Sequence, residues 1–204
     1  VHLYIGQDDQ DYFNSEIKNY ILRHRPGLKD TAWEIKTSIT AEELPKTFLR
    51  TIPNRYFYEA DSSVVCSFLR GLYTANGSVV STRVTLKSAS KKLVRQVQTL
   101  LSSIGIQSYI TTNRKHDTEF KNGTYECKES YDLNISTDRN KFAEVIGFIQ
   151  VYKTEALLDI INTVNKSKYA RRSKKENYDI TTNSQVSEEE VFDITVDCED
   201  HVYW

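Results

Sequence analysis

The chain has 204 residues, of which 39% are hydrophobic and 27% are charged, a composition typical of soluble globular proteins with a proper core. No apolar run is long enough to span a membrane and the start does not resemble a signal peptide, so we expect a cytoplasmic protein. Three widely spaced cysteines argue against a disulfide framework and against a zinc site.

The net charge of -1 conceals a separation of charge along the chain. Residues 70–153 carry 13 Lys and Arg against 7 Asp and Glu, whereas residues 185–204 carry 7 Asp and Glu and no Lys or Arg. A basic middle followed by an acidic end indicates two regions with different partners.

The first 60 residues are predicted to be the end of a larger unit. Residues 1–5 and 32–39 alternate as strands do, and residues 10–22 place apolar side chains at helical spacing before Pro26 and Gly27. Because a strand, a helix and a strand stand without earlier partners, we expect the chain to begin inside a domain. A short amphipathic segment and an aromatic-rich connector follow, at residues 42–52 and 54–60.

A helix is predicted next, ending at Asn76 and Gly77. Its apolar residues recur at helical spacing: Val64, Val65, Phe68, Leu69 and Leu72. Small residues fall four apart on a second face, which would let another helix come very close: Ser63, Ser67, Gly71 and Ala75. By themselves, Asn76 and Gly77 are typical of a helix end in the left-handed conformation.

The following segments alternate between strands and helices. Strands are predicted at residues 79–88, 106–115 and 125–136, with a turn at Asn122 and Gly123. Helices are predicted at residues 90–104, 139–149 and 154–164. The order is helix, two strands, helix, two strands, helix, although the pattern resolves the first hairpin only in part. The fold class is therefore α+β.

The polar face of these strands suits DNA. It presents donors at two-residue spacing: Arg83, Thr85, Lys87, Tyr109, Thr111, Asn113, Lys115, Lys128 and Asn134. Ordinary solvation of a one-sided sheet is the alternative interpretation.

Residues 69–77 resemble the nine-residue motif of the LAGLIDADG homing endonucleases. The flanking residues 68–73 and 77–79, Phe-Leu-Arg-Gly-Leu-Tyr and Gly-Ser-Val, resemble the copy found inside inteins. The resemblance implies an αββαββα half-unit whose sheet forms a saddle over double-stranded DNA. It also implies that two such helices pack together, and that the acidic residue before the final glycine binds Mg2+ or Mn2+ for DNA cleavage.

Asn76 stands where the family has that acidic residue. A neutral amide is a weaker ligand for a hard cation than a carboxylate, although its carbonyl oxygen or the main-chain oxygen of Ala75 could still coordinate. Lys87 and Lys128 are candidates for a base near the active site.

The end of the chain resembles the penultimate motif of inteins. Residues 190–196 followed by 197–204 are predicted to be two strands around an acidic turn. The resemblance implies that Asp193 and His201 assist the branch and Asn-cyclisation steps of protein splicing, since proton transfer needs a carboxylate and an imidazole. The amino-acid sequence around residues 68–80 and 122–135 is similar to that of inteins of ribonucleotide reductase. No Cys or Ser starts the chain and no His-Asn ends it, so we expect a fragment.

Four regions follow from these observations. We expect residues 1–60 to be the rear of a first half-unit with its connector, 61–165 the endonuclease half-unit, 166–185 a basic linker or phosphate contact, and 186–204 strands of a Hint splicing domain. The leading function is intein-encoded, site-specific, metal-dependent DNA cleavage, with the remaining intein segments as partners. A degenerate DNA-binding remnant and a homodimeric endonuclease are the alternatives.

Overall fold

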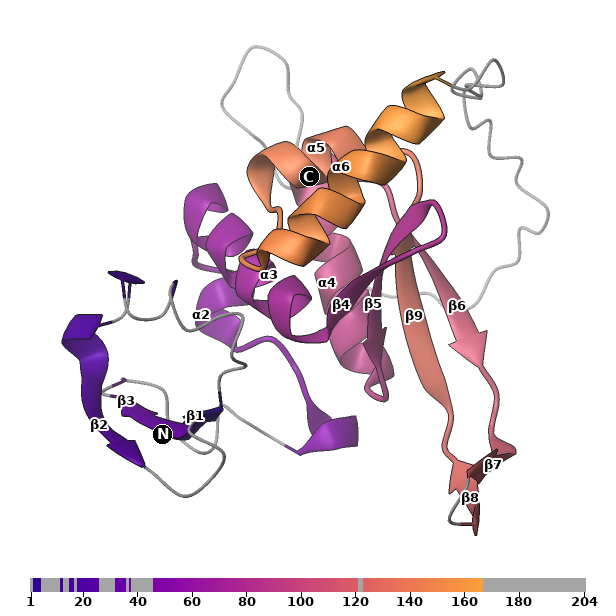
Figure 1. The fold of residues 1–204 in the computed structure, drawn as a ribbon, viewed down its shortest axis with the longest axis horizontal. Coiled ribbons are helices and arrows are strands. Elements are labelled where there is room, and N and C mark those ends of the chain that lie inside the picture. Colours follow the sequence, from indigo (N-terminus) through magenta and orange to yellow (C-terminus); the bar gives the residue numbers. More distant parts are fainter. Residues whose placement is uncertain are drawn as a thin grey trace, which may run out of the picture. The chain divides into compact units, whose positions relative to one another are not determined.

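The computed structural model describes residues 2–4, 12, 15–16, 18–25, 32–35, 37, 46–120 and 123–166. The chain divides into two compact units, Val1–Lys166 and Ser167–Trp204, and the second lies outside the described residues. Figure 1 labels the elements of the first unit. Among its helices, none combines the length and the apolar character that a membrane crossing requires.

The amino-terminal strands form a small antiparallel sheet of their own. Its order is β1 (His2–Tyr4), β3 (Ala32–Ile35) and β2 (Ile21–Arg25). The helix predicted to reach residue 22 is wrong at its end, because a 3-10 turn at Lys18–Tyr20 leads into β2. Pairing of β2 with β3 overrides the helical spacing of residues 21 and 22.

Residues 46–60 connect this sheet with the larger part of the fold. A 3-10 turn, η3 (Thr47–Leu49), is exposed, and the predicted aromatic connector contains a short helix, α2 (Asn54–Phe57). Ile52 is buried, and its backbone N–H donates to Gln96 Oε1 at 2.9 Å. The connector is therefore fastened to the core at Ile52.

Helix α3 (Ser62–Asn76) confirms the helix expected before Asn76 and Gly77. It buries Val65, Leu69 and Tyr73, whereas Val64 is exposed. The prediction of a left-handed helix end is wrong, because Gly77 is extended, with φ -88° and ψ 159°, and opens strand β4. Glycine is needed there for space, since a Cβ atom at Gly77 would lie 2.5 Å from the carbonyl oxygen of Tyr73.

Four antiparallel strands form the central sheet. Their order is β4 (Gly77–Val80), β5 (Arg83–Ser88), β9 (Ser130–Ile135) and β6 (Tyr109–Asn113). The single strand predicted at residues 79–88 is two strands, because a turn with Ser81 at φ 56° reverses the chain.

A two-stranded hairpin lies between β6 and β9 in the sequence (Figure 1). It consists of β7 (His116–Phe120) and β8 (Gly123–Cys127), which pair with each other. The strand predicted at residues 125–136 is therefore divided between β8 and β9. The break falls at Lys128 and Glu129, which have no ladder partner among the described strands.

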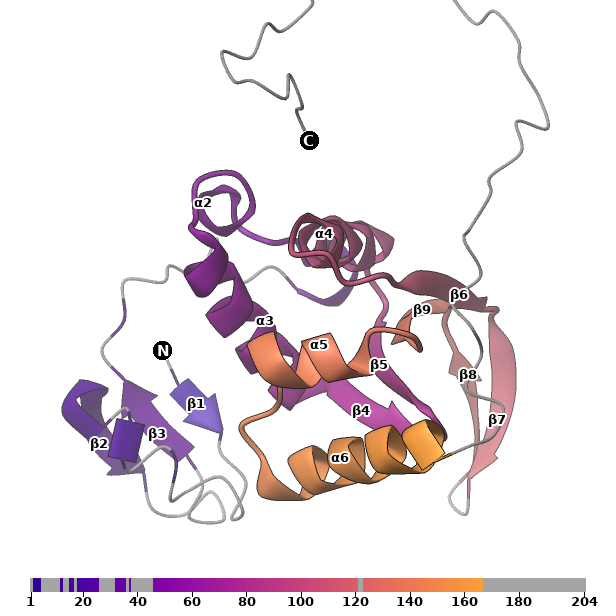
Figure 2. The same ribbon diagram turned by 90° about the horizontal axis from the view of Figure 1, so that it is seen from above.

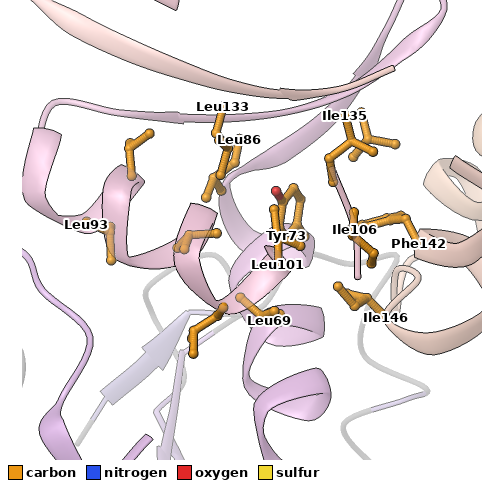
Figure 3. Close-up of a cluster of buried hydrophobic side chains, with 14 of the residues drawn as sticks. Leu69, Tyr73, Leu86, Leu93, Leu101, Ile106, Leu133, Ile135, Phe142 and Ile146 are labelled. Carbon is orange, nitrogen blue, oxygen red and sulfur yellow. The ribbon is translucent and has the colours of Figure 1, made fainter. Parts of the chain in front are cut away.

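Three further helices complete the fold, and with α3 they cover one face of the sheet. They are α4 (Lys91–Ser103), α5 (Arg139–Val145) and α6 (Val151–Lys166). Figure 3 shows sheet residues Leu86, Leu133 and Ile135 over helix residues such as Leu69 and Leu101. The predicted α+β class is confirmed, and the predicted order αββαββα differs by the β7–β8 hairpin inserted between β6 and β9 and by α6 after α5.

Helices α5 and α6 pack against each other, and α6 runs beside β4 (Figure 2). Two bonds join this pair to the end of α3: the Ile149 N–H donates to Thr74 Oγ1 at 3.0 Å, and Lys153 Nζ donates to the Thr74 carbonyl at 2.6 Å. Arg139 is buried and donates to the Thr82 carbonyl at 2.7 Å and to the Ser136 carbonyl. The first two bonds fix the carboxyl end of α3 to the α5–α6 segment, and Arg139 fixes the start of α5 to the turn between β4 and β5.

Candidate nucleic-acid interface

The helix-free face of the central sheet, here called the outer face, carries polar side chains in cross-strand rows. Lys87, Asp132 and Thr111 are register partners in one row, and Thr85, Asn134 and Tyr109 are partners in the next. Directly paired residues in antiparallel strands project to the same side of the sheet. The structure therefore brings together the predicted DNA-binding residues of β5, β6 and β9.

Two of these residues are not accessible. Thr85 and Asn134 are 7% and 1% exposed, and Thr85 Oγ1 donates to Asn134 Oδ1 at 2.9 Å. Asn134 Nδ2 in turn donates to Thr111 Oγ1 and to the Asp132 carbonyl, each at 3.1 Å. The pair holds three strands in register, and its predicted contact with DNA stays a prediction.

Other polar atoms on the same face have no hydrogen-bond partner among the described residues. They are buried side-chain atoms of Arg83, Asn113 and Asp132. Buried polar atoms without partners cost free energy in a folded protein. Because these atoms are closed to solvent in this structure, a ligand could reach them only after neighbouring side chains moved.

The described side chains of the β7–β8 hairpin are exposed, apart from the half-buried Cys127. Lys115, at its base, forms an ion pair with Glu126 on β8, and Tyr125 is 49% exposed. The predicted DNA-binding residue Lys115 is thus an exposed cation that already has an acidic partner.

A shallow cavity of 410 Å³ lies where α3 ends against the sheet. Its polar lining comes from Asn76 at the end of α3, Lys87 and Ser88 on β5, Ser130 on β9, and Arg50 and Thr47 in the preceding connector. We call this cavity the α3-end hollow. The backbone of Arg50 is fixed there, because Ser90 Oγ donates to its carbonyl oxygen at 2.6 Å.

The two lysines predicted as bases lie in different places. Lys87 lines the α3-end hollow together with Asn76. Lys128 instead places its ammonium group 5.1 Å from the centre of the Phe48 ring, a cation–π contact, and does not line the hollow. The geometry therefore favours Lys87 over Lys128 as the lysine beside the end of α3.

The donor set of the hollow does not fit a divalent cation. Its lining offers an amide and hydroxyl groups together with two cations, Arg50 and Lys87, and no carboxylate among the described residues. Mg2+ and Mn2+ prefer carboxylate oxygens and are repelled by cationic side chains. Within the described residues, no cluster of three or more His, Cys, Asp or Glu side chains is arranged to hold a metal. Asn76 and Ala75, the predicted metal ligands, are both exposed at the end of α3.

Sequence reasoning overlooked Arg50 and Lys153 near this helix end. Neither stands in a recognisable motif, and only folding brings Arg50 to the hollow beside Asn76 and Lys153 to the Thr74 carbonyl, from 26 residues before Asn76 and 77 residues after it. Asp193 and His201, the predicted splicing residues, lie outside the described residues.

The sequence profile of the LAGLIDADG-like domain matches residues 63–187. A DNA polymerase of Thermococcus litoralis is 33% identical over 118 residues, covering 54% of this chain and 6% of the polymerase. The chain thus spans a small part of that relative's length.

The chain is also similar to solved structures of the homing endonuclease I-DmoI. The structure with DNA and Mn is 21% identical, with a TM-score of 0.43, covering 72% of this chain and 80% of that chain. The structure with DNA and Ca is 20% identical, with a TM-score of 0.43, covering 78% and 81%. A third, of a single-residue variant with its target DNA and Mg, is 20% identical, with a TM-score of 0.42, covering 72% and 78%.

Proposed function

The chain belongs to the LAGLIDADG-like domain family, and from that premise we propose that residues 62–149 are a half-unit that binds double-stranded DNA on the outer face of its sheet. The observation that carries the proposal is the cross-strand row of Lys87, Asp132 and Thr111 on the outer face, beside which Tyr109 is also exposed. A twisted antiparallel sheet or ribbon fits the major groove, where side chains at two-residue spacing meet successive base edges.

The face of α3 that carries small residues supports pairing with a second half-unit. Ser63, Ser67, Gly71 and Ala75 are all exposed, and a Cβ atom at Gly71 would meet no atom within 4 Å. In the family resemblance two such helices pack together, and small residues allow close helix contact. We propose that this face receives the corresponding helix of another half-unit.

Metal-dependent DNA cleavage is the further activity that the resemblance implies. Mg2+ or Mn2+ would have to be held chiefly by carboxylates from the second helix end, because the described lining of the α3-end hollow provides none. Cutting of DNA therefore belongs to an assembled pair of half-units, whereas DNA binding belongs to this half-unit.

We also propose that this half-unit is part of an intein. The match to a short part of a DNA polymerase is compatible with an inserted element. Splicing roles for Asp193 and His201, and a ribonucleotide reductase as host, stay predictions from the sequence resemblance.

A matched pair of variants tests the proposed face. Thr111 lies exposed on the outer face, and Thr99 lies exposed on α4, on the helical side of the sheet. We expect Thr111→Glu to weaken binding of a labelled duplex by about tenfold, because it sets a negative charge against phosphates and base edges, and Thr99→Glu to have little effect. The measurement is fluorescence anisotropy, with folding checked by circular dichroism. Equal effects of the two variants would show that DNA binds elsewhere.

A further inference from the structure

The α3-end hollow has the charges of an anion site. Arg50 and Lys87 line it, and neither forms an ion pair with any described residue. The side chains of Asn76 and Ser130 add a neutral amide and a hydroxyl group. Two unpaired cations beside neutral hydrogen-bonding groups recognise a phosphate oxygen rather than a metal ion.

The framework around the hollow is fixed from several sides. Lys87 stands in a paired strand, opposite Asp132 on β9. Arg50 is held through its carbonyl oxygen by Ser90, the residue that also caps α4 by accepting from the Leu93 N–H at 3.2 Å. Two residues after Arg50, Ile52 is buried in the core. The backbones that carry the two cations are therefore in place before any ligand binds.

The end of α3 is also less attractive to a metal ion than a bare helix end. The carboxyl end of a helix carries partial negative charge and favours cations. Here Lys153 already places its ammonium group 2.6 Å from the Thr74 carbonyl oxygen. A metal ion approaching Asn76 in the hollow would meet Arg50 and Lys87, while Lys153 already occupies the Thr74 carbonyl oxygen at the same helix end.

We propose that the α3-end hollow binds a backbone phosphate of duplex DNA directly, through Arg50 and Lys87, without a bridging divalent cation. This inference rests on the proposed DNA binding for the identity of its ligand. Lys87 links the two surfaces, since it lines the hollow and also belongs to the row of Asp132 and Thr111 on the outer face. A duplex lying on that face would present its backbone to the hollow.

The test measures binding of the full 204-residue chain to a labelled random-sequence duplex, in EDTA and in MgCl2. We expect Arg50→Gln and Lys87→Gln each to weaken binding by about tenfold, equally in both buffers, and to lower the salt slope by about one. Lys92→Gln is the control, because it removes the same charge from the exposed face of α4. Its effect should be less than about twofold.

Other results would overturn the inference. If EDTA abolishes binding by the unaltered chain, or if Arg50→Gln behaves like Lys92→Gln, the phosphate is not held directly by the hollow, while the proposed DNA binding stands. If the unaltered chain binds no duplex at all, the proposed function fails. Inorganic phosphate then serves as the probe, with NMR shifts of the Lys87 and Ser88 amides as the measurement. Shifts that disappear in Arg50→Gln would support a phosphate site, and no shifts would overturn it too.

Discussion

Asn76 is uncharged, and it therefore leaves the α3-end hollow without a carboxylate. It is the last residue of α3, it is exposed, and it shares the hollow with Lys87 and Arg50. A carboxylate at this position would be attracted by the two cations and would repel a phosphate. The amide leaves the hollow with a net positive lining.

Asn76→Asp should reverse the metal dependence of DNA binding. In EDTA the new carboxylate repels phosphate, and we expect affinity for duplex DNA to fall by about tenfold, whereas Mg2+ or Mn2+ should restore it by bridging the two. Fluorescence anisotropy measures the affinity, and electron paramagnetic resonance of Mn2+ measures metal binding. Asn162→Asp, on exposed α6, is the control. Equal affinity of Asn76→Asp in both buffers would contradict this interpretation of the site.

The buried hydrogen bond between Thr85 and Asn134 should contribute more to the free energy of unfolding than the neighbouring bond from Asn134 to Thr111. Thr85→Val leaves the buried Asn134 Oδ1 without its donor, so the free energy of unfolding should fall by about 1–3 kcal/mol. Thr111→Val should cost less, because Asn134 Nδ2 still donates to the Asp132 carbonyl. Urea unfolding of both variants checks the order, and a larger loss in Thr111→Val would refute it.

Tyr73 should make the protein sensitive to alkaline pH. The side chain is wholly buried and its hydroxyl has no partner among the described residues, and this burial raises the pKa of the Tyr73 phenol well above its usual value near 10. Above pH 10 the phenol therefore ionises only in the unfolded chain, and stability present below that pH is lost as the pH rises, by about 1.4 kcal/mol per unit.

Tyr73→Phe tests this sensitivity. We expect it to raise the free energy of unfolding near neutral pH by about 1 kcal/mol, since it removes a buried hydroxyl without a partner, and to flatten the loss of stability above pH 10. The measurement is the urea midpoint from pH 8 to 11, and Tyr109→Phe on the exposed outer face is the control. Identical alkaline slopes for the parent chain and Tyr73→Phe would contradict the prediction.

Among the secondary-structure elements, the passage from α3 to β4 sets the geometry of the site. The helix changes directly into a strand at Gly77, so the end of α3 lies at the start of strand β4. Lys87 comes beside Asn76 because Gly77 pairs with Leu86, which places Lys87 one residue further along β5. The junction, rather than a loop, holds the hollow in shape.

Two glycines of this segment should respond in opposite ways to alanine. Gly77→Ala would place its Cβ atom 2.5 Å from the Tyr73 carbonyl oxygen, so we expect a loss of about 1–3 kcal/mol. Gly71→Ala, in the exposed middle of α3 with nothing within 4 Å, should stabilise the chain by about 0.5–1 kcal/mol. Thermal unfolding compares them. A destabilised Gly71→Ala would indicate that a partner helix already covers this face.

Over the molecule as a whole, charge is distributed unevenly and the net value misleads. The net charge is -1, yet residues 70–153 carry a surplus of six positive charges, from 13 Lys and Arg against 7 Asp and Glu. These residues contain the outer face and Lys87. Binding to a polyanion depends on this local surplus, not on the sum over the chain.

DNA affinity should therefore depend steeply on salt despite the net charge. Each Lys or Arg that neutralises a phosphate releases counterions, so we expect affinity to fall by about tenfold or more between about 50 and 200 mM salt. Anisotropy titrations in NaCl give the slope, and a titration of a neutral polymer serves as the control. An affinity that does not change over this range would exclude phosphate contacts as the main source of binding.

Local patterns in the chain were enough to predict the order of elements and the polar face, because apolar spacing and strand alternation follow from local geometry. They predicted α3, α4 and the alternating polar residues Arg83, Thr85 and Lys87 along β5. The motif at residues 69–77 led to the family. The same patterns failed at β2 and at the division of residues 79–88, where strand pairing and a turn overrule them.

Folding in three dimensions was needed to establish which polar residues are accessible and which residues gather at the end of α3. Burial of Thr85 and Asn134 follows from side-chain pairing across strands, which a single strand's pattern does not encode. Arg50 and Lys153 reach α3 from distant segments, held by Ser90 and Thr74. Charge at a site sums over residues brought together in space, and the order of residues along the chain does not give that sum.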